Sequence, residues 1–354
     1  MNFASDNTSG AHPAIMAAVV QANEGYAKSY GADALSLRAA ELLRQTFEAD
    51  DAAVWLVPTG TAANALALAT FANPFDAIFC TEVGHINVDE CNAPEFYTGG
   101  AKLITVPHRM GKITPGDLRR SVLGEETRGA HGAKRGPVSI TSVTEEGAVY
   151  TTAEIAAIAA VCQEFNLPLH LDGARFANAA AHLSVSASQM SWRAGVAAVS
   201  FGGSKNGCLG VEAVVFFDAE AAWQFERRRK RGGHLFSKHR FLAAQMVAYL
   251  EDGLWLELAA HANAMGQRLL RGLAQISEVE LPEASLNGET PANILFPRFP
   301  QALHEKMHAA GADYYVWSGN DEDTPETLQT ARLVTSWATT EADVDRFLEL
   351  LRAG

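Results

Sequence analysis

The sequence has few cysteines and lacks long apolar runs. Its 354 residues include four cysteines, and none of them form a C-x-x-C pair, so a disulfide framework is excluded and a reducing compartment is favoured. No uncharged apolar stretch approaches the length of a membrane span. The first residues also lack the basic and apolar regions of a secretory signal. We therefore expect a cytoplasmic protein without a membrane anchor.

Basic residues are scarce relative to acidic ones. Lysine and arginine number 28 against 41 aspartate and glutamate residues, which gives a net charge of -13. Nucleic acids and anionic lipid surfaces both attract basic surfaces, so neither is expected as a partner. Hydrophobic residues make up 48% of the chain, as is typical of soluble globular proteins. The length suffices for a large domain and a smaller one.

The first two thirds of the chain alternate between short apolar strands and helices. Such strands are typical of an α/β domain with a mostly parallel, buried sheet. The predicted strands are Ala53–Val57, Ala77–Cys80, Lys102–Val106, Val138–Thr141, Leu167–Leu171, Val196–Phe201 and Val211–Phe217, and two predicted helices are Ala62–Phe71 and Thr152–Phe165.

The pattern changes after Phe217. Helical periodicity dominates residues 219–275, and Pro282–Pro291 is a looser stretch. We predict a large domain at residues 1–245 and a small C-terminal α/β domain at residues 246–354. The elements predicted for the end of the small domain are strands Asn293–Phe296 and Arg332–Thr335 and helices Gln301–Ala310 and Glu341–Leu351.

Three polar signals follow predicted strands, where parallel α/β sheets bind ligands. They are Asp172 after one strand, Ser204-Lys205 after another, and Thr59-Gly60-Thr61 at the start of a helix. Taken singly, an aspartate there is usually a cap or turn residue, a lysine in a glycine-rich loop is usually solvated, and a threonine before a helix is often an N-cap. Their joint occurrence favours a shared role.

That shared role fits pyridoxal 5'-phosphate (PLP). The cofactor needs a lysine amine, here Lys205, for a Schiff base and an acid, here Asp172, for its pyridine nitrogen. Its phosphate needs backbone N–H groups at a helix N-terminus, which Gly60 and Thr61 offer. Ser204 adds a hydroxyl.

These residues also carry a resemblance. From end to end, the chain resembles the threonine aldolase family of fold-type I PLP enzymes, within the beta-eliminating lyase superfamily. The matching motifs are Phe3-Ala4-Ser5-Asp6-Asn7, Pro58-Thr59-Gly60-Thr61-Ala62-Ala63-Asn64, His170-Leu171-Asp172-Gly173-Ala174-Arg175, Phe201-Gly202-Gly203-Ser204-Lys205-Asn206-Gly207 and Ala331-Arg332-Leu333-Val334-Thr335. The resemblance implies an aspartate aminotransferase-like fold with a mostly parallel seven-stranded sheet.

The resemblance implies roles for single residues. Lys205 would carry the cofactor, Asp172 would pair with the pyridine nitrogen, and His85 would stack on the ring. Arg175 would contact the 3-oxygen side of the cofactor and the substrate carboxylate. Gly60 and Thr61 would hold the phosphate.

Further residues match positions near the substrate. Ser5 and Arg332 match carboxylate contacts, which places the N-terminal segment 1–12 near the active site. Tyr30 matches a tyrosine that a neighbouring subunit can supply. Lys230 or Arg231, in the basic run 227–231, either reaches a phosphate, within the chain or across a subunit interface, or belongs to a solvated helix end. The resemblance also implies a homodimer or homotetramer with shared sites.

The sequence departs from the commoner family pattern at two positions. Asn7 stands where many members have threonine. Glu145, in Thr144-Glu145-Glu146-Gly147, stands where many members carry a histidine near the substrate hydroxyl. The second departure leaves open the stereochemistry at Cβ and the range of side chains accepted.

The resemblance implies retro-aldol cleavage of L-threonine, L-allo-threonine or related β-hydroxy-α-amino acids such as phenylserine, to glycine and an aldehyde. His85, Glu145 or a water would remove the hydroxyl proton. A β-eliminating lyase or an aminotransferase would use the same Lys205 and Asp172. A PLP-binding protein without turnover is another alternative.

A zinc peptidase is a remote alternative. His304-Glu305-Lys306-Met307-His308 is a formal H-E-x-x-H motif. We expect Leu303, Met307 and Ala310 to form the buried face of this helix and the two histidines to flank its polar side. No metal site is therefore predicted.

Overall fold

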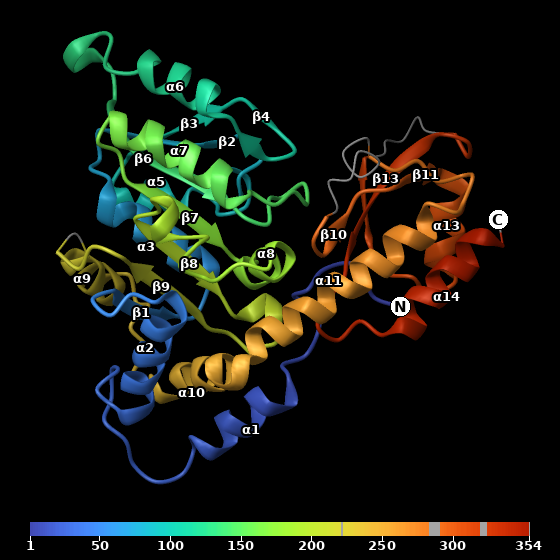
Figure 1. Ribbon diagram of the computed structural model, residues 1–354, viewed down its shortest axis with the longest axis horizontal. Coiled ribbons are helices and arrows are strands. Elements are labelled where there is room, and N and C mark those ends of the chain that lie inside the picture. Colours follow the sequence, from blue (N-terminus) through green and yellow to red (C-terminus); the bar gives the residue numbers. More distant parts are fainter. Residues whose placement is uncertain (221, 283–290, 319–323, 354) are drawn as a thin grey trace.

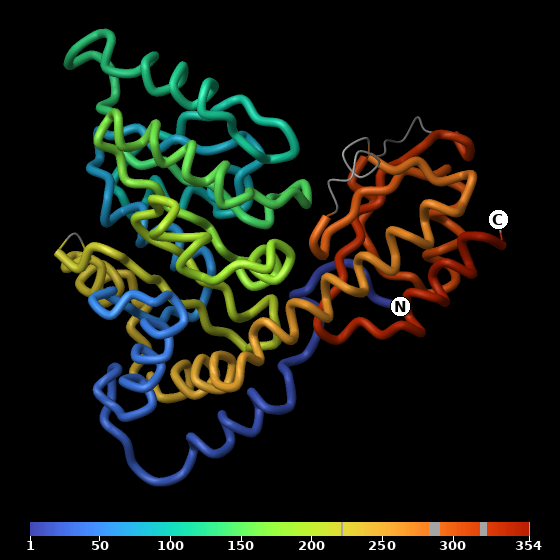
Figure 2. The backbone as a smooth tube through the Cα atoms, in the orientation of Figure 1, coloured from blue at the N-terminus to red at the C-terminus, as the bar shows by residue number. Residues whose placement is uncertain are grey.

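The computed structural model describes residues 1–220, 222–282, 291–318 and 324–353. Figure 1 shows a large body built around a sheet and a smaller body beside it, connected by helix α11, Leu254–Leu273. The N-terminal segment, blue in Figure 2, starts at the smaller body and then runs to α1 beneath the larger one. Most of the predicted Pro282–Pro291 stretch lies outside the described residues.

The large sheet has seven strands in the order β1-β9-β8-β7-β6-β2-β3. β9 pairs antiparallel with β1 and β8, whereas the other neighbouring strands run parallel. The expected mostly parallel seven-stranded sheet is confirmed. The strands are β1 Ala53–Val57, β2 Asp76–Thr81, β3 Lys102–Val106, β6 Lys134–Thr141, β7 Leu169–Gly173, β8 Ala198–Gly202 and β9 Glu212–Phe216, with a separate hairpin of β4 His108–Arg109 and β5 Lys112–Ile113.

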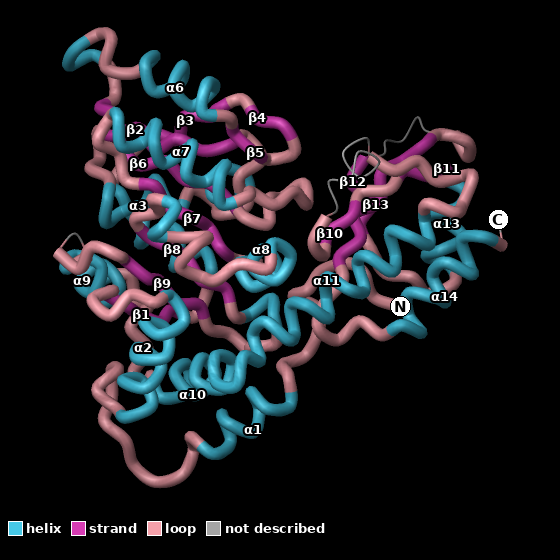
Figure 3. The backbone as a smooth tube through the Cα atoms, in the orientation of Figure 1, coloured by secondary structure: helices cyan, strands magenta, loops and turns pink. Residues whose placement is uncertain are grey.

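Helices cover both faces of this sheet, and Figure 3 shows the strands enclosed between them. Side chains alternate along β8, so Val199 and Phe201 join one core cluster whereas Ala198 joins the cluster beneath α3. The helices of the large body are α1 Pro13–Gln21, α2 Ala34–Phe47, α3 Gly60–Phe71, α4 His85–Val88, α5 Ala93–Thr98, α6 Pro115–Gly124, α7 Thr152–Glu164, α8 Phe176–Leu183, α9 Trp223–Arg231 and α10 Arg240–Leu250, with short 3-10 helices η1 Gly129–His131, η2 Trp192–Ala194, η3 Ser204–Asn206 and η4 Glu251–Gly253.

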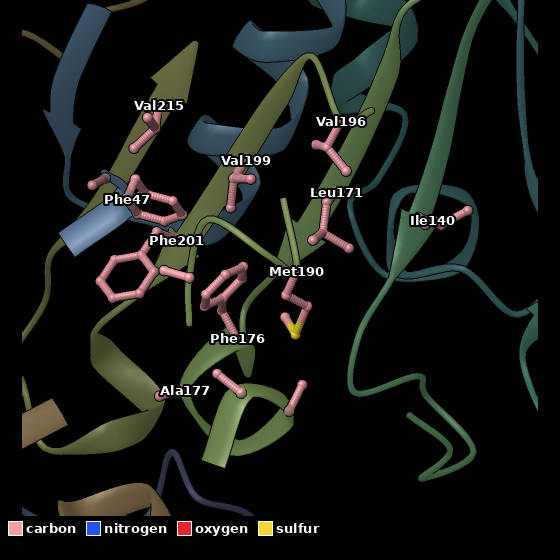
Figure 4. Close-up of a cluster of buried hydrophobic side chains, with 14 of the residues drawn as sticks. Phe47, Ile140, Leu171, Phe176, Ala177, Met190, Val196, Val199, Phe201 and Val215 are labelled. Atoms are coloured by element: carbon pink, nitrogen blue, oxygen red, sulfur yellow. The ribbon is translucent and has the colours of Figure 1, made fainter. Parts of the chain in front are cut away.

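Aromatic side chains fill the core between the sheet, α2 and α8. Phe201 packs edge-on against Phe47 and Phe176 with ring centroids 5.6 Å apart in each pair, an arrangement that aromatic rings prefer. Figure 4 shows these three rings together. This packing fixes β8, which leads directly into the loop that carries Lys205.

Helix α3 is apolar on every side because it lies between the sheet and helices α5 and α9. All side chains from Ala62 to Ala69 are buried. Most of them are alanines, which allow the helix to lie close to the sheet. Its first turn is thereby held at the edge where the strands end.

The smaller body has its own sheet and core. β10 and β11 pair with β13, and β12 pairs with β13 as well. Its core cluster includes Phe3 from the N-terminus beside Phe347. Its elements are β10 Ile294–Leu295, β11 Arg298–Pro300, α13 Gln301–Ala309, β12 Tyr315–Ser318, β13 Leu328–Val334 and α14 Glu341–Arg352.

The sequence located the seven strands of the large sheet, helices α3, α7, α13 and α14 and strand β10 to within a few residues, and it predicted the helical region that holds α9, α10 and α11. It did not predict α1, α2, α4, α5, α6 or α8. It missed β11 and β12, because both are short and β12 is fully exposed along its length. It also missed the hairpin β4–β5, which is two residues long on each side. Within the described part of the chain, no helix is both long and apolar enough for a bilayer.

Candidate active site

A pocket at the carboxyl ends of the sheet strands collects the residues that the sequence singled out. β7 and β8 run in parallel with Asp172 opposite Ser200, so Asp172 and the loop after β8 end at the same edge. The pocket lies at the edge where β7 and β8 end. Its lining consists of Gly60, Asn64, His85, Thr141, Val143, Glu145, Asp172, Ala174, Arg175 and Lys205.

Lys205 projects into this pocket from η3. Burial lowers the pKa of its amine, and the charge of Arg175 lowers it further, while Asp6 and Asp172 oppose the shift. Among the described residues, none forms a hydrogen bond or salt bridge with the amine. A buried amine with a lowered pKa is more often neutral and is then a nucleophile towards a carbonyl carbon.

Asp172 is fixed at the end of β7. Its Oδ1 accepts the Ala174 N–H at 3.0 Å and its Oδ2 accepts the Asn64 side-chain amide at 2.8 Å. Its exposed fraction is 3%. These two bonds hold the carboxyl group in one orientation on the pocket wall.

The N-terminus of α3 forms another wall. Thr59 caps the helix by accepting the Ala62 N–H at 3.2 Å. No atom lies within 4 Å of the position a Cβ would take at Gly60, so a ligand has open access to the helix end. Thr61 is half-buried in this first turn. Ser204 lies in η3, and its Oγ accepts the Val211 N–H at 3.3 Å.

His85 is held by two carboxyl groups. Its Nδ1 lies 2.9 Å from Glu90 Oε1, and its backbone N–H donates to Glu145 Oε1 at 2.8 Å. The hydrogen bond that His85 makes to the Glu90 carboxylate raises the pKa of His85, and burial partly opposes this. Sequence reasoning missed Glu90, because only the folded turn after α4 brings its carboxyl group to His85.

Glu145 also lines the pocket. Its Oε1 also accepts the Thr141 hydroxyl at 3.1 Å. Burial raises the pKa of this carboxyl. Glu145 therefore orients His85 through the backbone of α4.

Arg175 forms a buried bidentate ion pair with Asp6, at 2.7 and 2.8 Å. Asn293 donates to the same carboxylate at 3.2 Å. Arg332 lies nearby on β13, donates to the Ala4 carbonyl at 3.0 Å, and has its guanidinium 5.7 Å from the Trp317 ring centroid. The segment 1–12 thus reaches Arg175, which lines the pocket, and Arg332 lies close enough to feel the charge of Arg175. Asp6 belongs to the motif at residues 3–7, but its pairing with Arg175 depends on the tertiary fold.

Other predicted residues lie away from the lining of this pocket. Ser5 Oγ accepts the Asn7 N–H at 3.1 Å. Tyr30 is 49% exposed and its ring lies 4.6 Å from the Lys230 amine. Lys230 and Arg231 end α9, and both are exposed. Their expected roles across a subunit interface stay predictions.

The prediction for the buried face of the H-E-x-x-H helix was wrong at two residues, His304 and Ala310. His304 is buried in the small core, stacked on Phe299 with centroids 3.9 Å apart, whereas Ala310 is exposed. His304 replaces Ala310 on the buried face because both its ring nitrogens have partners, the Gln329 carbonyl and the Tyr314 hydroxyl. In the described ranges, no cluster of potential metal ligands occurs.

The donor set fits PLP on the observations above. A buried amine that has no hydrogen-bond partner among the described residues, an oriented carboxylate and an open helix N-terminus surround one pocket. These are the groups that the cofactor's carbonyl carbon, ring nitrogen and phosphate need.

Comparisons with known proteins agree with this geometry. Residues 2–291 match the model of the beta-eliminating lyase family. The low specificity L-threonine aldolase of Pseudomonas aeruginosa is 41% identical over 350 residues, covering 99% of this chain and 96% of that one.

Solved structures share the fold. The threonine aldolase of Leishmania major superimposes with a TM-score of 0.91 at 29% identity and covers 99% of this chain and 98% of that one. Serine palmitoyltransferase of Sphingomonas wittichii has a TM-score of 0.67 at 17% identity, covering 100% and 86%. The expected fold class, that of fold-type I PLP enzymes, is confirmed. The chain therefore belongs to the beta-eliminating lyase family and, within it, to the low-specificity L-threonine aldolases.

Proposed function

We propose that this protein is a PLP-dependent aldehyde-lyase that cleaves L-threonine, L-allo-threonine or related β-hydroxy-α-amino acids to glycine and an aldehyde. The observation that carries the proposal is the placement of Lys205 and Asp172 at adjacent strand ends, facing a pocket that the start of α3 also lines. The matching names of the Pseudomonas aeruginosa and Leishmania major relatives support it.

The residues divide the work of holding the cofactor. Lys205 would bond its carbonyl carbon, Asp172 would pair with its ring nitrogen, and the N–H groups of Gly60 and Thr61 would bind its phosphate with the Ser204 hydroxyl. PLP supplies an electron sink for the bond that breaks at Cα of the substrate. The lowered pKa of Lys205 favours a neutral amine that can leave and return.

The arginines would bind the amino acid. Burial lowers the pKa of Arg332 and the charge of Arg175 lowers it further, so the two side chains lie near each other. A planar guanidinium binds a carboxylate through two hydrogen bonds. Holding the carboxylate there, with help from Ser5, fixes which bond at Cα faces the electron sink.

The proton of the β-hydroxyl needs an acceptor. His85 and Glu145 both line the pocket, and a water is the other candidate. As that proton leaves, the O–H electron pair forms the aldehyde carbonyl and the Cα–Cβ electron pair stays on Cα. A proton added to Cα completes glycine.

Replacing Lys205 tests the proposal. Lys205→Ala should abolish aldehyde formation from threonine and the visible absorbance of bound PLP together. The matched control is Lys102→Ala, an exposed residue of β3, which should keep both. An active Lys205→Ala enzyme would overturn the proposal.

A substrate panel separates the neighbouring reactions. Threonine, allo-threonine, serine and the phenylserine diastereomers would each be assayed for glycine and aldehyde. Keto acid and ammonia would indicate a β-eliminating lyase, and dependence on a second keto acid would indicate an aminotransferase. The same panel establishes the preferred stereochemistry at Cβ.

We further propose a cytoplasmic homodimer or homotetramer with shared sites, acting on small amino acids in glycine metabolism. Tyr30 and Lys230 are the residues expected at a shared site. The division into domains 1–245 and 246–354 is also proposed, and the separate core of the smaller body supports it.

A further inference from the structure

A chain of hydrogen bonds joins His85 to Asp172. Glu90 Oε1 lies 2.9 Å from His85 Nδ1 and accepts from Asn64 Nδ2 at 2.9 Å. The same Asn64 nitrogen donates to Asp172 Oδ2 at 2.8 Å. An asparagine amide has two hydrogens, so each serves one carboxylate. The residues come from α3, α4 with the turn after it, and β7.

We propose that Glu90 and Asn64 are positioning residues that keep the proton of neutral His85 on Nδ1, leave Nε2 as its proton acceptor, and link His85 to Asp172. The inference rests on the proposed function at one point only, namely that the proton accepted by Nε2 comes from the β-hydroxyl group of the substrate. The arrangement itself is a property of the folded chain.

Burial isolates this network from water. Asn64, Glu90 and Asp172 have exposed fractions of 2%, 4% and 3%, whereas the His85 side chain is 37% exposed. A hydrogen bond to a charged group is stronger where water is excluded. Of the four side chains, His85 is therefore the one that a substrate can reach.

The direction of each bond assigns the histidine tautomer. Oε1 of Glu90 is the acceptor for Asn64, and its other oxygen, Oε2, has no hydrogen-bond partner among the described residues. An ionised Glu90 only accepts, and Nδ1 of His85 then donates in this bond. In the neutral ring, Nε2 is then the nitrogen with the lone pair.

Four charged side chains act on His85 or bind it. Glu90 and Asp172 favour its protonated form, Lys205 opposes it, and Glu145 accepts its backbone N–H. Glu90 in turn faces His85, Asn64 and Asp172, and burial raises its own pKa. Removing the negative charge of Glu90 while keeping its shape should therefore weaken His85 as a base.

Ring-nitrogen NMR of isotope-labelled histidine in the full-length, PLP-loaded protein tests the assignment, with His85→Gln identifying the signal. The wild type should show Nδ1–H in neutral His85. Glu90→Gln keeps an acceptor but no charge, so the His85 pKa should fall by about 1–3 units. Glu90→Ala reports the loss of the bond between His85 and Glu90. Asn64→Ala reports the loss of the bridge between Glu90 and Asp172.

Glu82→Gln is the matched control, because Glu82 precedes α4, its side chain is 72% exposed and it faces His108. It should leave the His85 pKa unchanged. In the catalytic assay, Glu90→Gln should move the acidic limb of kcat/KM to lower pH and lower the plateau about tenfold or more, because a weaker base is easier to deprotonate but accepts a proton less well.

The NMR result decides the proposal without any turnover. An Nε2–H tautomer in the wild type, or an unchanged His85 pKa in a folded Glu90→Gln protein, would overturn it. If the NMR result is as expected but no aldehyde is formed, the proposed function fails and the network stands. Melting curves confirm that each variant is folded.

Discussion

Asp6 and Arg175 are 169 positions apart in the chain and form a bidentate ion pair with both side chains buried. The pair ties the N-terminal segment to the turn after β7, beside Asp172. It also orients the guanidinium on the pocket wall where the substrate carboxylate is proposed to bind. A segment that begins in the small core thus becomes part of the site.

Asp6→Asn should destabilise the protein by about 3–5 kcal/mol at pH 7, because Arg175 would lose its buried counter-ion. Burial would raise the pKa of Asp6, but the charge and hydrogen bonds of Arg175 outweigh it and lower the pKa. The stabilisation is therefore present above the unfolded-state pKa and is lost as pH falls through the folded-state value.

Urea unfolding of both proteins at pH 7 and pH 3 measures this effect. The difference between wild type and Asp6→Asn should shrink at the lower pH. Equal stabilities at pH 7 would show that the pair contributes nothing.

Gly202→Ala should impair cofactor binding. A Cβ at this position would clash with the Ala174 carbonyl oxygen, so the backbone between Asp172 and Arg175 would have to move. We expect PLP affinity to fall about tenfold or more, since such displacements misplace site groups. Spectroscopic PLP titration measures it.

Gly124→Ala is the control for Gly202→Ala, because open space surrounds its Cβ position at the end of α6. It should bind PLP as the wild type does. Wild-type affinity in Gly202→Ala would show that the strand ends accommodate the extra methyl group.

Glu145→Ala should lower kcat about 10- to 100-fold, because the His85 N–H and the Thr141 hydroxyl both lose their acceptor and α4 loses its anchor. Glu145→Gln keeps an acceptor for the His85 N–H and should recover most of the activity. Steady-state kinetics with threonine measure both. If Glu145→Gln is as impaired as Glu145→Ala, the charge of Glu145 matters more than its hydrogen bonds.

His170 should make stability fall in acid. Burial lowers its pKa to about 4, and the nearby Asp172 only partly opposes the shift. Its ring lies between the Ser139 and Ser200 hydroxyls at 2.9 Å each. The unfolded chain takes up the proton near pH 6.5, so this group should remove about 3 kcal/mol of stability between pH 7 and pH 4.

Chemical unfolding of His170→Gln across this pH range tests the effect. The variant should lose less stability than the wild type on acidification. His131→Gln changes an exposed residue and should follow the wild type. Parallel curves for wild type and His170→Gln would contradict the assignment.

Sequence reasoning located the cofactor residues because parallel strands end at one edge. Apolar runs predicted β7 and β8, so Asp172 and Lys205 had to lie near each other once those strands were neighbours. The resemblance added Arg175, His85 and Arg332, of which the first two line the pocket and the third lies close to Arg175.

The sequence by itself determined the rhythm of strands and helices and the residues at the strand ends, because these follow from local periodicity and from chain direction in a parallel sheet. Only the tertiary structure decided that Asp6 pairs with Arg175, that Asn64 joins Glu90 to Asp172, and that His304 is buried. Each of these depends on where buried polar groups find partners, and residues distant in the chain supply those partners only after the elements have packed.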